Sequence, residues 1–146
     1  MDRIVQMKQS QCYSKHVFAE LGIAQWSRLD DAFVVRTRRG ATFLLSPNSD
    51  DNVFTRVHID EIEVPEPLRR RGVATAAMAT LCRLADKYQF TLEGGPIGWR
   101  EDPWRDKFVE WMFRFGFEPD PSPVLPPVDD PGAFYVCRQP KPDATT

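Results

Sequence analysis

A β-rich run that leads through a short turn into an amphipathic helix restricts the fold of this chain more than any other feature. The run spans residues 53–64 (VFTRVHIDEIEV), and only PEPLRRR separates it from a helical pattern over residues 72–88. A strand and a helix this close in sequence usually pack as two layers, so they favour a mixed α/β fold. The apolar face of the helix carries Val73, Ala77, Leu81, Leu84 and Tyr88.

Shorter patterns on both sides predict the remaining elements. Strand patterns occur at residues 3–7, 32–38, 41–46, 90–92 and 133–138, and further helical patterns at residues 14–23 and 102–116. Ser14 is a suitable N-cap for the first of these helices, and Asp102-Pro103 is a strong start for the second. Residues 119–132 contain six prolines and predict a semi-extended surface loop.

Length and composition indicate an ordinary globular protein. The chain has 146 residues, which fits a single domain over residues 1–146. It has no apolar run near the roughly 18 residues of a membrane helix and no signal-peptide stretch, so we expect a cytoplasmic location and no membrane partner. Cys12, Cys82 and Cys137 are widely spaced without a CxxC pair, which disfavours a metal site and a disulfide framework.

The turn before the helix of residues 72–88 has the chemistry of an anion site. Arg69, Arg70 and Arg71 stand directly before Gly72. The first N–H groups of a helix have no partner within it, and the helix dipole adds positive partial charge there. A glycine lets the backbone approach a phosphate closely, and arginines contribute full charges. The segment is therefore predicted to bind an anion, most simply a pyrophosphate.

Three short motifs occur in series in the second half of the chain. The first is RRRGVA at residues 69–74, the second WMFRFGF at residues 111–117, and the third FYVCRQP at residues 134–140. In pattern and order they resemble R/Q-x-x-G-x-G/A, F-Y-x-R-x-G-F and x-R-x-P of the GNAT (GCN5-related N-acetyltransferase) superfamily. The resemblance covers about residues 53–140, and the N-terminal third is less distinctive.

The resemblance implies a fold, an activity and a binding site. The fold is α/β (mixed α+β), with a central, mostly antiparallel mixed sheet whose middle strands splay apart and with flanking helices. The activity is transfer of an acetyl group from acetyl-CoA, or another acyl group from acyl-CoA, to a primary amine of a small molecule, peptide or protein. The residues implied to bind acyl-CoA are Ile62 and Val64 through pantetheine, Arg71, Gly72, Val73, Ala74 and Thr75 through their N–H groups, and Arg69, Arg70 and Arg71 through their side chains.

The strand of residues 53–64 changes phase in its middle. Val57 and Ile59 are apolar on one alternation, whereas Ile62 and Val64 are apolar on the other. Such a change indicates a β-bulge, and the resemblance implies one in this strand. The alternative is a strand that is buried on both faces at its middle.

The candidate proton acceptors lie around the expected splay. His58 stands where the histone-acetylating branch of the family has a carboxylate base, and imidazole can accept a proton at neutral pH. Alternatively, His58 only bonds a backbone carbonyl at the bulge. Asp60 and Glu93, like Glu61 and Glu63, could act through a water or bind a cationic acceptor, or they could be solvated charges.

The proton donor departs from the family pattern. Met112 stands where the family often has a tyrosine, and methionine cannot donate a proton. Tyr135 and Ser122 are candidate substitutes, and a thiolate is also a tolerable leaving group without one. Arg105 replaces the usual asparagine of this helix, and Trp99 is a candidate for the acceptor pocket.

Two other functions remain open. A GNAT-like domain that binds CoA or a protein partner without catalysis would explain Met112. A nucleic-acid-binding surface would use Arg36, Arg38, Arg39 and the arginines before Gly72, although the formal net charge of −2 disfavours it. Analogy with the family adds a homodimer as a candidate assembly.

Overall fold

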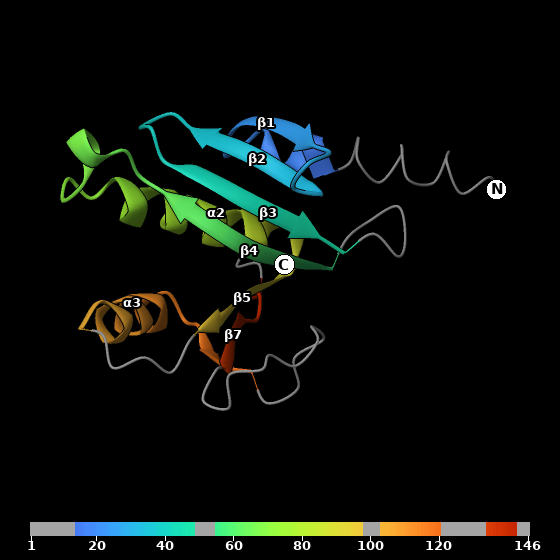
Figure 1. Cartoon of the computed structure of the whole chain (residues 1–146). Coiled ribbons are helices and arrows are strands. Elements are labelled where there is room, and N and C mark those ends of the chain that lie inside the picture. Colours follow the sequence, from blue (N-terminus) through green and yellow to red (C-terminus); the bar gives the residue numbers. More distant parts are fainter. Residues whose placement is uncertain (1–13, 49–54, 98–102, 121–133, 143–146) are drawn as a thin grey trace.

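The strands of the protein form one sheet in the computed structural model, which describes residues 14–48, 55–97, 103–120 and 134–142 (Figure 1). The strands are β1 Gly22–Ser27, β2 Ala32–Thr37, β3 Thr42–Pro47, β4 Arg56–Glu63, β5 Thr91–Ile97, β6 Glu118–Pro119 and β7 Phe134–Arg138. The helical elements are a segment at residues 14–18, the short helix η1 Glu66–Leu68, α2 Val73–Tyr88 and α3 Pro103–Arg114. Across these ranges, no helix combines the length and the apolar character needed to cross a membrane.

The sheet has the strand order β1-β2-β3-β4-β5-β7-β6. β1 to β4 form an antiparallel meander, β4 and β5 are parallel, and the remaining neighbours are antiparallel. A parallel pair needs a crossover connection, and α2 supplies it. The predicted mixed, mostly antiparallel α/β sheet is therefore confirmed.

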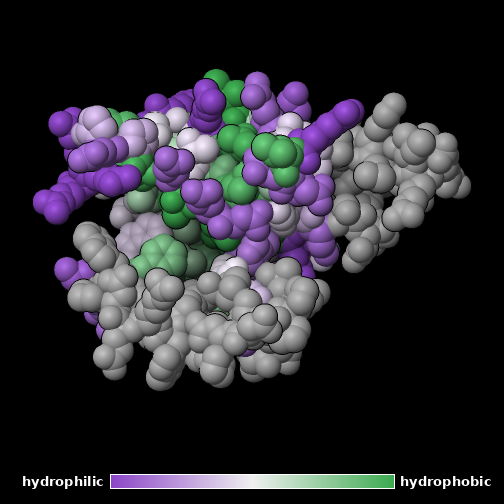
Figure 2. Space-filling model, viewed as in Figure 1, coloured by the Kyte–Doolittle hydropathy of each residue, from purple (hydrophilic) through white to green (hydrophobic). Residues whose placement is uncertain are grey.

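The hydrophobic core lies between the sheet and α2. Its strand residues include Phe33, Val35, Phe43, Leu45, Val57 and Leu92, and its α2 residues include Val73, Ala77, Met78, Leu81 and Leu84. Strand alternation turns the intervening side chains to the opposite face, where Ile23 is 69% exposed and Val34 is half-buried. Figure 2 views this opposite face, and apolar residues cross its middle with hydrophilic residues around them.

A β-bulge interrupts β4 at Asp60. Leu44 of β3 pairs with Glu61, but the next residue of β3, Leu45, pairs with Ile59, so Asp60 is the extra residue. The buried side chains before the bulge, such as Ile59, and the half-buried Ile62 after it therefore belong to different alternations. The bulge predicted from the change of phase is confirmed.

The helix predicted over residues 14–23 is wrong beyond residue 18. The Leu21 N–H closes a turn on Phe18 O at 2.9 Å, and Gly22 already begins β1. A Cβ at residue 22 would lie 2.0 Å from the Arg36 carbonyl oxygen, so a glycine permits this close pairing with β2. Phe18 and Leu21 are nevertheless buried, because one helical turn is enough to place both against the core.

Other element boundaries differ less. The strand predicted to begin at residues 90–92 is β5, which extends to Ile97, and β6 was not predicted because Pro119 belongs to it. The predicted start of α3 at Pro103 is confirmed, and Gly116, with a φ of 94°, follows its end as predicted. The predicted strand at residues 3–7 lies outside the described residues.

Arg138 of β7 joins the sheet to α2 and to the residue that follows α3. Its guanidinium donates to the two carboxylate oxygens of Asp86 in α2 at 2.9 and 3.2 Å, and its Nε donates to Phe115 O at 2.7 Å. Arg138 is 4% exposed, so its charge depends on these partners. Burial alone would raise the pKa of Asp86, but hydrogen bonds from Arg138 and from the Lys141 N–H hold this pKa below its ordinary value.

We expect Asp86→Asn to lower the free energy of unfolding by about 2 kcal/mol near neutral pH, because a buried guanidinium loses its counter-charge. Since the folded pKa of Asp86 is lowered, the stabilisation is fully present above the unfolded pKa of about 3.9. It is lost as the pH falls through the lower folded pKa. Urea unfolding of both proteins across this range checks the prediction, with the exposed Asp106→Asn as the control. If the free energies of unfolding of the two proteins still differ at a pH below the folded pKa of Asp86, the prediction is contradicted.

Candidate functional site

The segment between β4 and α2 lines an open cavity of about 220 Å³. Gly72 is the N-cap of α2 and has a φ of 72°, and Arg70 also has a positive φ of 65°. These two left-handed residues turn the chain from η1 into the helix. The residues that line the cavity are Val64, Leu68, Arg69, Arg70, Gly72, Val73, Ala74 and Thr75.

The cavity presents hydrogen-bond donors. The N–H groups of Val73, Ala74 and Thr75, in the first turn of α2, have no partner within the helix. This turn contains no acidic residue, so no side chain in it neutralises the positive end of the helix dipole. A Cβ at Gly72 would meet nothing within 4 Å, so open space lies beside the donors. The residues present therefore fit a pyrophosphate group.

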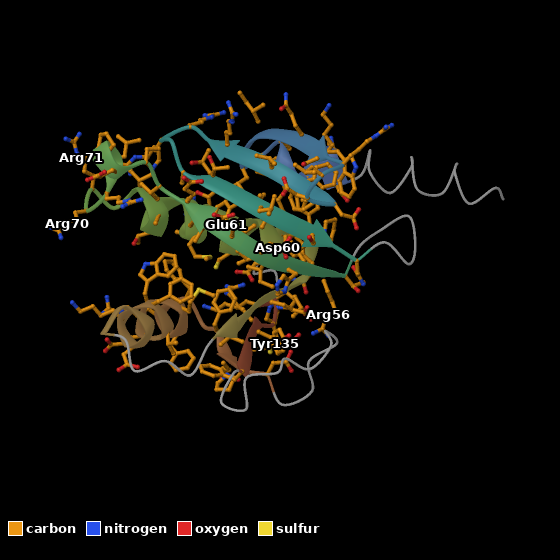
Figure 3. All side chains as sticks on the ribbon, in the orientation of Figure 1. Arg56, Asp60, Glu61, Arg70, Arg71 and Tyr135 are labelled. Carbon is orange, nitrogen blue, oxygen red and sulfur yellow. The ribbon has the colours of Figure 1, made fainter. Side chains whose placement is uncertain are left out.

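The three arginines of this segment differ in their surroundings. Arg69 Nε donates to Val64 O at 3.0 Å, so the side chain of Arg69 closes the turn and occupies a carbonyl expected to face pantetheine. Arg70 and Arg71 are exposed, and neither has a hydrogen bond or ion pair with another described residue. Figure 3 shows both at the end of the molecule where α2 starts. Arg70 and Arg71 are thus the side chains best placed to meet a phosphate.

β4 and β5 separate beside this cavity. They pair from Arg56 with Thr91 to Ile59 with Gly94, and beyond that point β4 pairs with β3 while β5 pairs with β7. In Figure 1, β4 continues toward the start of α2, whereas β5 turns away from it. The last residues of β4, Ile62 among them, consequently have no strand on their β5 side among the described residues. The backbone there is open to an extended ligand.

His58, Asp60 and Ser46 form a polar cluster where the two strands separate. His58 Nε2 lies 3.4 Å from Asp60 Oδ1, and Ser46 Oγ donates to Asp60 Oδ2 at 2.5 Å. His58 Nδ1 is buried and has no hydrogen-bond partner among the described residues. Burial lowers the pKa of His58, and this outweighs the opposite effects of the Asp60 carboxylate and the Gly95 backbone. The lowered pKa favours the neutral imidazole of His58 near pH 7.

Glu93 occupies a different environment from Asp60. It is 7% exposed, and its Oε1 accepts from Arg56 in a close ion pair. Arg56 Nη2 also lies 3.7 Å from Asp120 Oδ2. The structure thus places the Glu93 carboxylate against a cation of β4. In the described part of the chain, no group of three or more His, Cys, Asp or Glu side chains is placed to hold a metal ion.

Met112 of α3 and Tyr135 of β7 pack against two glycines of β5. A Cβ at Gly94 would lie 3.3 Å from Met112 Cε, and one at Gly95 would lie 3.1 Å from Tyr135 Cδ1. Met112 is 2% exposed and Tyr135 is 7% exposed, so both pack tightly against this strand. The position at which a tyrosine was expected is therefore filled by a buried thioether, with the Tyr135 ring on the next strand.

Trp111 links α3 to the cavity at the start of α2. Its Nε1 donates to Thr75 Oγ1 at 3.0 Å, and its ring packs against Phe115 at a centroid distance of 5.2 Å. It is half-buried against the core, as its helical spacing indicates. Ser122 and Trp99 lie outside the described residues.

Sequence reasoning missed Ser46 and Arg56. Ser46 pairs with His58 across β3 and β4, and Arg56 reaches Glu93 because β4 and β5 are parallel neighbours. The residue spacing within a single strand predicts neither the pairing of Ser46 with His58 nor the contact of Arg56 with Glu93. Only the register of three strands brings these side chains together.

Comparison of the sequence with family models and with curated proteins found no match. Solved structures do match, among them Ard1 from Thermoplasma volcanium, which is 19% identical over 90% of this chain and 80% of that chain with a TM-score of 0.51. The histone acetyltransferase HPA2 and related acetyltransferase from Corynebacterium glutamicum is 13% identical over 96% of this chain and 77% of that chain, with a TM-score of 0.50. An acetyltransferase from Bacillus subtilis, solved in complex with CoA, is 13% identical over 86% and 91%, with a TM-score of 0.48. The protein has the GNAT fold.

Proposed function

We propose that this protein is an acyl-CoA-dependent N-acetyltransferase that acetylates a primary amine of a small molecule, peptide or protein. One observation supports this most strongly. The open edge of β4 runs directly into a cavity whose donors, at the start of α2, suit a pyrophosphate. CoA combines an extended pantetheine arm with a pyrophosphate, and this arrangement matches that combination in order along the chain.

Each part of the site has a role in holding acyl-CoA, which supplies the thioester whose acyl group is transferred. The N–H groups of Arg71 to Thr75 bind the pyrophosphate, with Arg70 and Arg71 contributing charge. The backbone of Ile62 and the N–H of Val64 bind the pantetheine arm, because the Val64 carbonyl already accepts a hydrogen bond from Arg69. Arg69 positions Val64, because its guanidinium holds the Val64 carbonyl.

His58 acts as the general base in this proposal. A neutral imidazole with Nε2 toward Asp60 would accept the proton of the attacking amine at Nδ1, and because Nδ1 is buried, the amine or a bridging water has to enter between β4 and β5 to reach it. The Asp60 carboxylate then stabilises the imidazolium, and Ser46 holds Asp60 in place. Asp60 is thus a positioning residue, and Glu93, paired with Arg56, is the less suitable base.

Proton return to the leaving thiolate has two routes. A thiol has a pKa of about 8.5, so the thiolate is a tolerable leaving group without an acid. Tyr135, buried against Gly95, is the candidate donor if one acts. Met112 has no proton to give.

A buried Met112 also favours a second candidate function, a domain that binds CoA without transferring the acyl group. Calorimetric titration of acetyl-CoA tests the part that the two functions share. We expect a Kd in the micromolar range, at about −8 kcal/mol. No binding at millimolar acetyl-CoA would contradict both.

A further inference from the structure

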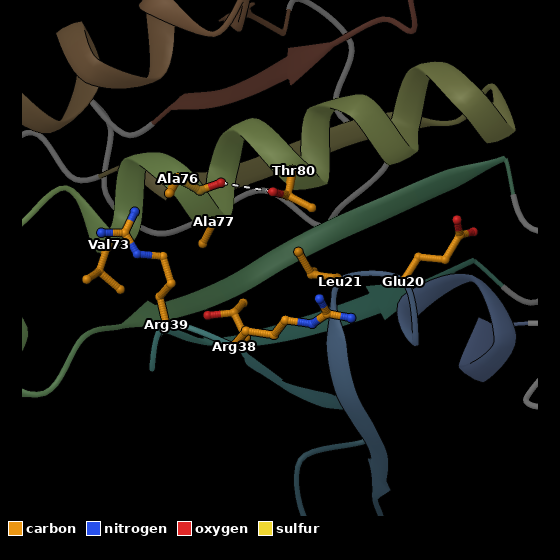
Figure 4. Close-up of a pocket in the computed structure, with 9 residues that line it drawn as sticks. Glu20, Leu21, Arg38, Arg39, Val73, Ala76, Ala77 and Thr80 are labelled. Atoms are coloured by element: carbon orange, nitrogen blue, oxygen red, sulfur yellow. Dashed lines mark hydrogen bonds between the residues drawn. The ribbon is translucent and has the colours of Figure 1, made fainter.

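A second cavity, of about 310 Å³, lies on the other flank of α2 (Figure 4). The turn between β2 and β3 forms one wall, the first turns of α2 form another, and the residues that follow the helical segment 14–18 close its end. The residues that line it are Glu20, Leu21, Thr37, Arg38, Arg39, Val73, Ala76, Ala77 and Thr80.

The floor of this second cavity is apolar and its rim is cationic. Leu21, Val73 and Ala77 are each at most 5% exposed and form the floor. Arg38 and Arg39 are exposed at the rim, and neither has a hydrogen bond or ion pair with another described residue. Figure 4 shows Arg39 extending toward Val73, and Arg38 extending in the direction of Leu21. Two guanidinium groups are therefore available beside an apolar surface.

The other polar groups of the second cavity are already engaged. Thr80 Oγ1 donates to Ala76 O at 3.1 Å, and Thr37 Oγ1 donates to Ala41 O at 3.0 Å. Glu20 accepts from Lys87 Nζ at 2.6 Å, so its negative charge is compensated. What remains to attract a ligand is positive charge.

The second cavity is distinct from the acyl-CoA cavity. Val73, Ala76, Ala77 and Thr80 have the spacing of one helix face. Thr75, which bonds to Trp111 of α3, points to a different side of the same helix. The flank that α3 occupies and the flank with the second cavity are therefore separate, and they meet only at Val73.

We propose that the second cavity binds a small organic anion, a carboxylate or phosphate carried on a short apolar body. Guanidinium groups form paired, charge-assisted hydrogen bonds with both kinds of anion. The apolar floor requires a ligand with carbon atoms beyond the charged group, and the volume is at the lower end of the usual range for small-molecule sites, about 300–1,000 Å³. The binding itself does not depend on the proposed acetyltransferase function.

Two features connect the second cavity to the segment before α2. Val73 lines both cavities, and a Cβ at Gly40 would lie 2.6 Å from Leu68 Cδ1, so the turn between β2 and β3 packs on η1. An anion that draws Arg38 and Arg39 toward α2 therefore also acts on Leu68 and the segment after it. We therefore expect the bound anion to change the affinity for acyl-CoA, and acyl-CoA to change the affinity for the anion by the same factor. This coupling rests on the proposed function.

Amide chemical-shift mapping of the full ¹⁵N-labelled chain tests the site without acyl-CoA. Isovalerate and phenyl phosphate are the carboxylate and phosphate probes, and inorganic phosphate lacks the apolar body. We expect at least one organic probe to shift the amides of residues 37–40 and 76–80 saturably, and inorganic phosphate to bind at least about tenfold more weakly. No saturable shift with either organic probe, or equal binding of inorganic phosphate, would overturn the proposal.

Arg38→Gln/Arg39→Gln removes both charges and keeps much of the side-chain length. We expect it to weaken probe binding about tenfold or more, since charge-assisted hydrogen bonds are lost. Arg36→Gln is the matched control, because Arg36 lies on the opposite face of β2 and should leave probe binding unchanged. If the double variant is folded, as its spectrum would show, and still binds the probes as tightly as the wild type, the proposed site is wrong.

Calorimetry of acetyl-CoA with and without the bound probe tests the coupling. We expect the Kd for acetyl-CoA to change about fivefold or more in the wild type and not in the double variant. An unchanged Kd with the probe bound would refute the coupling. If acetyl-CoA does not bind at all, the proposed function fails, and the mapping above decides the anion site by itself.

Discussion

Replacing Gly72 by alanine is expected to weaken acetyl-CoA binding at least about 100-fold, because several charge-assisted hydrogen bonds are lost together. Gly72 has a φ of 72°, and the space beside it is open. A side chain there is strained and places a methyl group where we expect the pyrophosphate to approach the first turn of α2. Calorimetric titration of the wild type and the variant measures the loss.

Gly116→Ala is the matched control for this variant. Gly116 also has a positive φ, and a Cβ there would have its nearest contact at 3.7 Å, from Arg138 Nε. Alanine at residue 116 therefore carries the same kind of backbone strain away from the acyl-CoA cavity. It should cost stability and leave the Kd for acetyl-CoA unchanged. Equal binding by the wild type and both variants would show that the pyrophosphate does not lie beside Gly72.

His58→Ala is expected to lower kcat about 10²- to 10⁴-fold, the usual contribution of a general base, while the Kd for acetyl-CoA stays the same. The imidazole lies where β4 and β5 separate, and its Nδ1 has no partner among the described residues. Steady-state kinetics measures the loss of kcat, and calorimetry checks that the Kd for acetyl-CoA is unchanged. His58→Gln, which keeps a polar side chain, should be as slow as the alanine variant. Full activity in either variant would exclude His58 as the base.

The pH profile separates a base from a structural histidine. Burial lowers the pKa of His58, so kcat/KM should rise with pH through a value below the ordinary 6.5 or so and then stay level. The Asp60 carboxylate raises this pKa, so Asp60→Asn should move the rise to still lower pH. If His58 only supported the fold, Asp60→Asn would leave the pH at which kcat/KM rises unchanged.

The parts of the fold that local patterns determine could be predicted from the sequence. The change of apolar phase between Ile59 and Ile62 predicted the bulge, because burial of alternate residues is a property of one strand. Likewise, the glycine and arginines before α2 predicted an anion-binding segment, and the structure has unpaired donors beside a cavity there, because the N-terminus of a helix leaves its first N–H groups without partners whatever surrounds it.

The parts that depend on long-range pairing could not be predicted. The helical spacing of Phe18 and Leu21 predicts a helix up to residue 23, whereas the close pairing of Gly22 with β2 makes Gly22 the start of β1. The ion pair between Arg56 and Glu93 depends on which strands become neighbours across the crossover. Glu93 therefore looked like an available carboxylate in the sequence, although it faces a cation in the fold.

The most direct test of catalysis is the release of CoA thiol from acetyl-CoA when amines are added. A diamine, a peptide with a free α-amine and a lysine-containing peptide cover the main classes of primary amine. If the protein is an N-acetyltransferase, at least one amine releases thiol in step with its acetylated product, measured by mass spectrometry, and His58→Ala slows this release. If acetyl-CoA binds but no amine releases thiol above the uncatalysed rate, the protein binds CoA without transferring the acyl group.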